Sequence, residues 1–152
     1  MVGVFLTSLA ESAAQPAGKS SGAGGARGDR MDHARDTGAA LEAHYRFILW
    51  LVPAVERFPR NRKFLLGDRM QTTALDVLER LIEATYIKRR EGYLAAANLG
   101  LEKLRFLFRL ARDLRVLDHR HYEYAARSID DTGRKVGAWT KAHRAHKSPR
   151  AV

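Results

Sequence analysis

Over residues 37–146 the apolar side chains recur at spacings of three and four, and little interrupts that rhythm. Pro53 and Pro59 are the only prolines in this stretch, and glycines are sparse after Gly38. An α-helix brings every third or fourth residue onto one face, whereas a strand alternates its faces. The pattern therefore predicts an all-α domain over residues 37–146.

The apolar rhythm divides into four segments, each with one stripe that needs a partner to cover it. The first stripe consists of Leu41, His44, Ile48, Leu51, Val55 and Phe58. The second consists of Leu66, Met70, Thr73, Val77, Leu81 and Ala84. The third consists of Leu94, Ala97, Leu101, Leu104, Leu107 or Phe108, Ala111 and Leu114, and the fourth of Tyr122, Ala125, Ile129, Thr132, Val136, Trp139 and His143. Four helices with short connections favour an antiparallel up-down-up-down four-helix bundle.

Prolines, a glycine and a capping residue indicate where these helices begin and end. Pro53 removes a backbone donor within the first stripe and is expected to kink that helix, which should end at Phe58 because the next residue is a proline. The second helix is expected over about residues 63–89, with Gly92 as the break before the third. Asp118 is a suitable N-cap for the fourth helix.

The two ends of the chain differ from the helical body. Residues 1–36 are rich in Ala, Gly, Ser and Pro, a composition that cannot bury enough apolar surface to fold alone. We interpret them as a disordered N-terminal extension, or as translated upstream sequence ahead of a true start at Met31. A secretory signal is disfavoured because no Lys or Arg precedes the short apolar stretch. Residues 147–152 are interpreted as a basic C-terminal tail.

The charge balance indicates an anionic partner. Lys and Arg total 27 against 17 Asp and Glu, which gives a formal net charge of +10. Such a field attracts polyanions, and although anionic lipid is an alternative, the apolar run 47–55 is too short to span a bilayer. The chain has no cysteine, which excludes disulfides, thiolate metal sites and cysteine nucleophiles and fits a cytoplasmic location.

No catalytic, metal or cofactor site is expected. The groups that deserve a test are His119 with His121, His143 with His146, and Glu123 with Asp130 and Asp131. Residues two apart do not face one another on a helix, and histidines in a basic tail are more often solvated. The carboxylates have basic neighbours within one turn, so ion pairs explain them more simply than acid–base chemistry. An enzyme of unknown chemistry stays as a minor alternative.

Basic residues concentrate at the helix connections and along two helices. In an antiparallel bundle the first and third connections share one end, which should place residues 57–63 near Arg115 and Arg120. Spacings of four and three put Arg105, Arg109 and Arg112 in one row on the third helix. Arginine binds phosphate in a bidentate manner, so we expect nucleic acid, RNA or DNA, to be held by its backbone with little base specificity. The expected contact residues are Arg60, Arg62, Lys63, Lys88, Arg89, Arg90, Arg105, Arg109, Arg112, Arg134 and Lys135.

Several segments, taken in order, resemble a known family. They are residues 50–53, 58–67, 76–84, 97–111 and 122–139, and they include Trp50, Pro53, Gly67 and Trp139. They are similar to the Avd family of diversity-generating retroelements, part of a wider four-helix-bundle group that includes the ribosomal intervening-sequence proteins. The resemblance implies a homopentameric barrel with a positive surface that binds a reverse transcriptase and its template RNA or DNA. It implies no catalytic residues and adds the polymerase as a partner for the basic residues above.

Two rival interpretations stay open. An intervening-sequence protein would share the fold but be encoded within a ribosomal RNA gene, so genome context separates it from an Avd-like protein. A helical toxin, antitoxin or scaffold would use its charge on a protein partner. Salt-sensitive binding to RNA, absent for a neutral polymer, separates that class from a nucleic-acid-binding protein.

Overall fold

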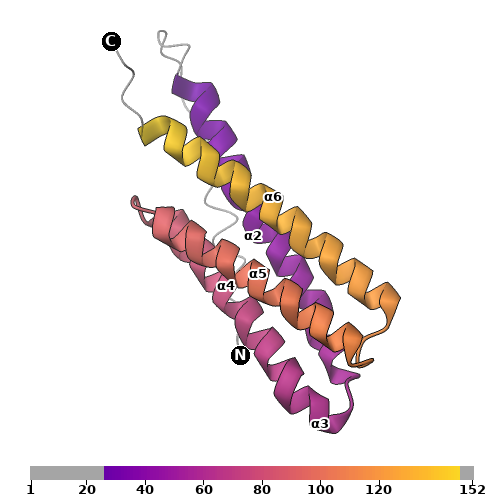
Figure 1. Cartoon of the computed structure of the whole chain (residues 1–152). Coiled ribbons are helices and arrows are strands. Elements are labelled where there is room, and N and C mark those ends of the chain that lie inside the picture. The colour runs from indigo at the N-terminus through magenta and orange to yellow at the C-terminus, as the bar shows by residue number, and fades with distance from the viewer. Residues whose placement is uncertain (1–25, 148–152) are drawn as a thin grey trace, which may run out of the picture.

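The computed structural model describes the backbone of residues 26–147 and the side chains of residues 38–147. Its elements are α2 (Ala26–Glu56), the single turn α3 (Arg60–Arg62), the π-helical turn η1 (Lys63–Gly67), α4 (Asp68–Tyr86), α5 (Glu91–Asp113) and α6 (His119–Lys147). The four long helices lie side by side and alternate in direction (Figure 1). No strand occurs among the described residues.

The helices form a closed ring of neighbours. α2 packs against α4 and α6, and α5 packs against the same two helices from the other side. This arrangement confirms the antiparallel up-down-up-down bundle. The connections at residues 57–59 and 114–118 lie together at one end, which we call the α3 end, and the connection at residues 87–90 lies at the other, which we call the opposite end (Figure 1).

The buried stripes agree closely with the sequence in three helices. The second predicted stripe is buried in full, from Leu66 to Ala84. On α5 the choice between Leu107 and Phe108 is decided for Phe108, and Leu114 is wrong as a core residue because 43% of it is exposed. On α6 the stripe is buried from Ala125 to Trp139, with its terminal members only partly covered.

The first stripe needed correction. Ala40 and Phe47 are buried, whereas the predicted Leu41 and Ile48 are only partly buried beside them. Leu41 with Ile48 and Ala40 with Phe47 both have helical spacing relative to the rest of the stripe. Packing buries the second pair, which includes the aromatic ring of Phe47. The Phe47 ring meets the Phe108 ring edge-on at 5.8 Å between centroids, so this residue joins α2 to α5 across the core.

An aromatic group lies where α2 meets the start of α6. The Trp50 ring lies 4.7 Å from the Tyr124 ring and 6.2 Å from the His121 ring, centroid to centroid. These contacts bring α2 and the first turns of α6 together near the α3 end. They also explain why Trp50 is only partly exposed although it lies off the predicted stripe.

Several predicted boundaries shift. α4 ends at Tyr86, and Gly92 lies in the first turn of α5, so Gly92 is not the break between these helices. Ile87 ends α4 with an extended backbone (φ −102°, ψ 131°), which needs no glycine. α2 passes through Pro53 and ends at Glu56, close to the expected stop at Phe58.

α2 begins earlier than expected, and α6 is capped by the expected residue. α2 begins at Ala26, inside the segment assigned to the N-terminal extension. Residues 1–25 and 148–152, and the expectations that concern them, lie outside the described residues. Asp118 caps α6 as expected, because its Oδ1 accepts the backbone N–H of His121 at 2.8 Å. That bond, together with the His121 ring, lowers the pKa of the Asp118 carboxyl.

A close approach of α4 and α5 occurs at Gly100. A Cβ built on this glycine would overlap with Cγ2 of Val77, which is itself buried. The missing side chain therefore lets the two helices come nearer than an alanine would allow. Gly137 on α6 is the contrasting case, since a Cβ there would meet nothing within 4 Å.

One buried polar residue joins α2 to α4. His44 is fully buried, and its Nε2–H donates to the carbonyl oxygen of Ala74 at 2.7 Å. Its other ring nitrogen, Nδ1, has no hydrogen-bond partner. Burial lowers the pKa of His44 from its ordinary value of 6.5, although the bond to Ala74 opposes this. His44 is therefore held neutral in the folded protein.

We expect His44 to make the bundle less stable in mild acid. Its folded pKa is below its unfolded pKa, so its contribution is complete above pH 6.5 and is lost as pH falls toward the lowered value. The loss grows as pH falls below 6.5 and levels off below the lowered pKa. Urea unfolding at pH 7.5 and 5.5 measures it.

His44→Gln is the matched control, because glutamine can donate to Ala74 but does not titrate. The free energy of unfolding of this variant should fall less than that of the wild type between the two pH values. All other ionisable groups are the same in the two proteins, so their contributions cancel in the difference. Equal losses in the two proteins would show that His44 is not held neutral.

Candidate nucleic-acid interface

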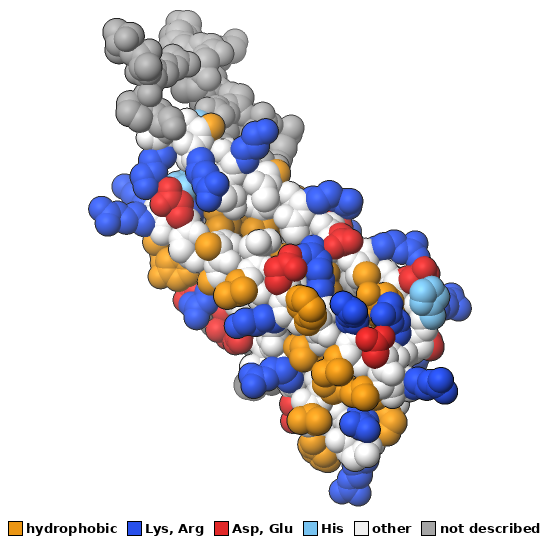
Figure 2. Space-filling view, viewed as in Figure 1, with side chains coloured by type: hydrophobic (Ala, Val, Ile, Leu, Met, Phe, Trp, Pro, Cys, Tyr) orange, Lys and Arg blue, Asp and Glu red, His pale blue; other side chains and the backbone are white. Residues whose placement is uncertain are grey.

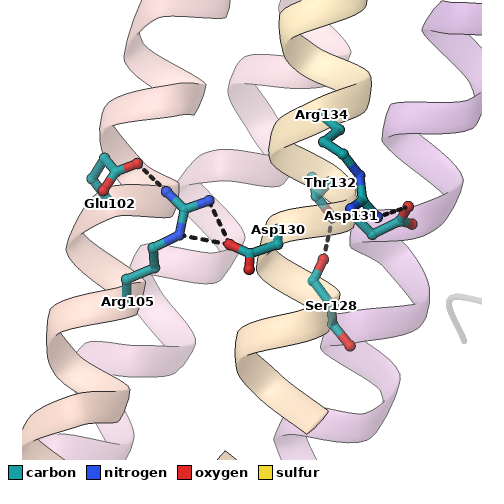
Figure 3. A network of polar contacts seen from close by, with 7 residues as sticks. All are labelled: Glu102, Arg105, Ser128, Asp130, Asp131, Thr132 and Arg134. Atoms are coloured by element: carbon teal, nitrogen blue, oxygen red, sulfur yellow. Dashed lines mark hydrogen bonds and ion pairs between the residues drawn. The ribbon is translucent and has the colours of Figure 1, made fainter. Parts of the chain in front are cut away.

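The predicted arginine row on α5 forms, but its first member is committed to the fold. Arg105 lies 33% exposed between two carboxylates, one on each of two helices (Figure 3). Its Nε and Nη2 contact Asp130 Oδ1 on α6 at 3.0 and 2.9 Å, and its Nη1 contacts Glu102 on α5. Arg105 therefore joins α5 to α6 and is not free to meet a ligand.

The other two arginines of the row also have acidic neighbours. Arg112 donates to Asp113 at 2.9 and 3.1 Å and stacks over the Tyr122 ring at 4.3 Å. Arg109 is more exposed, and its Nε lies 3.8 Å from Asp113 Oδ2. Exposed ion pairs of this kind are worth about 0–1 kcal/mol, so phosphate can compete for Arg109 more easily than for Arg105.

The predicted basic pair on α6 shares one carboxylate. Arg134 Nη2 lies 3.3 Å from Asp131 Oδ1 (Figure 3). Lys135 contacts the other oxygen of the same group. The Lys135 hydrogen bond is the main cause of a lowered pKa for Asp131, against a smaller opposing effect of burial. Asp131 thus pairs with basic residues within one turn, as expected, whereas Asp130 pairs instead with Arg105 on the neighbouring helix α5.

The α3 end carries cations without acidic partners. Lys63 pairs with Glu56, but Arg60 and Arg62 have no ion-pair partner among residues 38–147. Arg57 and Arg115 line one pocket at this end, which confirms that the first and third connections meet. These two arginines were expected to lie near each other, but they are not among the expected contact residues.

The opposite end likewise carries both unpaired cations and cations that contact other side chains. Lys88 and Arg89 are exposed, and within the described part of the chain neither has an ion-pair partner. Arg90 instead lies over the Trp139 ring at 5.8 Å from its centroid, with its Nε buried and without a hydrogen bond. Lys147 pairs with Glu91 at 3.1 Å and is the main cause of a lowered pKa for that carboxyl.

The eleven expected contact residues therefore separate into two groups. Arg60, Arg62, Lys88 and Arg89 are cations available to a ligand. The remaining members hold acidic side chains or, for Arg90, an indole ring. On the face drawn in Figure 2, Lys and Arg alternate with Asp and Glu, and hydrophobic side chains gather over the half of the bundle toward α3.

Two histidines at the start of α6 each contact one carboxylate. His121 Nδ1 lies 2.6 Å from Asp118, and His119 Nε2 lies 3.2 Å from Glu123. Each contact joins one histidine to one acid within α6 or its cap. Among the residues that the structure describes, no group of three or more His, Asp or Glu could hold a metal ion.

Comparison with known proteins yields one family. A family model described as bAvd-like matches residues 40–143, which include most of α2 and all of α4 and α5. A search of curated proteins finds no match. Across the described helices, none combines the length and apolar character that crossing a membrane requires.

Proposed function

The chain belongs to the bAvd-like family, and from that premise we propose that it is a non-catalytic accessory subunit of a diversity-generating retroelement. In this role it binds nucleic acid through the phosphate backbone and partners the reverse transcriptase that copies the template. The family membership supports the type of element. The net charge of +10 supports an anionic ligand.

The observation that carries the nucleic-acid part is the pair of free cationic clusters, one at each end. Arg60 with Arg62 and Lys88 with Arg89 are the expected contact residues that no acidic side chain of the described chain occupies. An unpaired guanidinium or ammonium group loses no internal ion pair when it meets a phosphate. These four residues are therefore the proposed contacts, ahead of the α5 row.

The separation of the clusters sets the length of nucleic acid that can touch both. α4, with 19 residues, lies between them, and a rise of 1.5 Å per residue makes this distance about 30 Å. Successive phosphates of one duplex strand advance by about 3.4 Å, so about nine steps are needed to bridge the ends. A 20-bp duplex can engage both clusters, whereas a 6-bp duplex can engage only one.

We propose in addition that five copies assemble into a barrel, as the family resemblance implies. A groove between α4 and α5 exposes Leu99, Leu110 and Phe106, the last of which is 67% exposed. Monomers rarely leave contiguous apolar surface of this kind uncovered, and a neighbouring copy would cover it. Assembly would repeat the two cationic clusters five times, so weak contacts would add by avidity.

Neutralising the four free cations should weaken nucleic-acid binding far more than neutralising four paired ones. The test variant carries Arg60→Gln, Arg62→Gln, Lys88→Gln and Arg89→Gln. With about 5 phosphates neutralised, the wild-type slope of log affinity against log salt should be about −4 to −5, and the variant should lose about 3 to 4 of that slope. Fluorescence anisotropy with a 20-bp duplex over a salt series measures it.

The matched control removes the same charge from paired residues. Arg46, Arg80, Arg127 and Lys147 contact Glu42, Glu83, Glu123 and Glu91, respectively. Their replacement by glutamine should change the slope by less than about 1. If the two variants lose affinity equally, binding follows net charge and not the end clusters. Co-purification with the reverse transcriptase of the same retroelement, with and without nuclease, tests the protein partner separately.

A further inference from the structure

A pocket of about 610 Å³ opens at the α3 end of the bundle, between the connection that leaves α2 and the connection that enters α6. The charged and titratable side chains that line it are Arg57, Arg112, Arg115, Asp118, His119 and His121. Buried Phe58 and Leu117 supply part of its apolar wall. The pocket thus brings Arg57, from the connection after α2, together with Arg112 on α5 and Arg115 in the connection before α6.

The positive charge of this pocket is only partly neutralised by acidic side chains of the protein. Arg57 and Arg115 are exposed and have no ion-pair partner among residues 38–147. Arg112 is held by Asp113 and Tyr122. Asp118 is the carboxylate of the lining, and both of its oxygens already accept bonds from His121. An anion that enters would therefore meet two unengaged guanidinium groups.

The backbone at Arg115 adds an independent observation. Arg115 has φ 55°, and it is the only non-glycine residue with a positive φ in the described chain. The N–H groups of Arg115 and Val116 donate to the carbonyls of Arg112 and Ala111, each at 2.9 Å. This is the left-handed helix ending that normally selects glycine, because a Cβ is disfavoured there. An unfavourable left-handed backbone conformation thus occurs at a residue that lines the pocket.

We propose that this pocket binds a phosphate group of a nucleic acid strand, with Arg57 and Arg115 as its principal contacts. Two guanidinium groups that approach from different connections can surround a phosphate with charge-assisted hydrogen bonds. α6 begins at His119 in the lining, so the positive end of its helix dipole favours the same charge. The inference rests on the proposed nucleic-acid role and adds a defined site that lies outside the two end clusters.

Arg115→Gly separates binding from stability, because the two should move in opposite directions. Removing the left-handed strain should raise the Tm by about 2 °C or more. Removing the guanidinium should weaken binding of a 12-nucleotide single strand about tenfold at low salt. Arg57→Gln should weaken binding similarly without a gain in Tm. Lys103→Gln, an exposed and unpaired cation on α5 outside this pocket, is the control and should change neither quantity appreciably.

Three probes identify the phosphate that is bound: the strand with a 5′-phosphate, the same strand without it, and inorganic phosphate as a competitor. If Arg115→Gly and Arg57→Gln lose affinity only for the 5′-phosphorylated strand, the pocket binds a terminal phosphate. If they lose affinity equally for both strands, the pocket binds an internal phosphate. Competition by inorganic phosphate that Arg115→Gly abolishes would support the pocket directly. Unchanged binding by both Arg115→Gly and Arg57→Gln, while the end-cluster variant loses affinity, would overturn the pocket alone. If the wild type binds the 20-bp duplex but neither strand, the pocket alone is overturned. If it binds none of the three, the proposed function is overturned as well.

Discussion

Val136→Asp is expected to unfold the bundle at physiological temperature. Val136 lies on the buried stripe of α6 with 1% of its surface exposed, and the buried residues of the described chain include no Lys or Arg. Burial of an unpaired carboxylate costs several kcal/mol, which is a large part of the 5–15 kcal/mol that stabilises a typical domain. A thermal melt followed by far-ultraviolet circular dichroism measures the effect.

The control places the same carboxylate two positions along the same helix. Ala138 is exposed, so Ala138→Asp changes charge and helix propensity without burial and should alter stability by less than about 1 kcal/mol. A wild-type melting curve for Val136→Asp would contradict the packing of α6 described above. Similar losses in both variants would assign the effect to charge and not to burial.

Gly100→Ala is expected to destabilise the bundle by roughly 1–3 kcal/mol, as overpacking of a core usually does. The added methyl group would overlap with Val77 Cγ2, and a β-branched side chain in a helix has one strongly preferred rotamer. α4 and α5 would therefore have to move apart. Urea unfolding of the purified variant gives the free energy.

Two further variants make this prediction specific. Gly137→Ala meets open space and should stabilise by up to about 1 kcal/mol, because alanine is the better helix former. Val77→Ala should rescue Gly100→Ala in part, since the space that the valine leaves accommodates the new methyl group. If the two losses simply add in the double variant, Gly100 and Val77 are not in contact.

The second and fourth stripes could be predicted because each runs unbroken at spacings of three and four. On α4 a second series, Leu75 and Ile82 among it, has the same period but stays exposed. The first stripe failed at Leu41 and Ile48 because Ala40 and Phe47 have the same spacing, and only the position of Phe108 across the core decides between them. The prediction that Gly92 separates the second and third helices was wrong for a local reason. The chain leaves α4 through Ile87, which has an extended backbone, and not through a left-handed glycine.

The candidate site shows the same limit. Acidic partners within one turn, such as Asp113 for Arg109, can be read directly from the sequence. The contact of Arg105 with Asp130 spans two helices, and so does the position of Arg90 over Trp139, so neither could be recognised before the fold was known. Arg115 gave no signal because the residue that usually marks a left-handed position is absent there.

The placement of the two tryptophans has a practical consequence. Trp50 stacks with His121 near the α3 end, and Trp139 lies beneath Arg90 near the opposite end. The two indole rings have different surroundings, so Trp50→Phe and Trp139→Phe would each leave a single tryptophan at a known location. Occupancy of the two ends can then be followed independently by light emission, without a dye attached to the molecule.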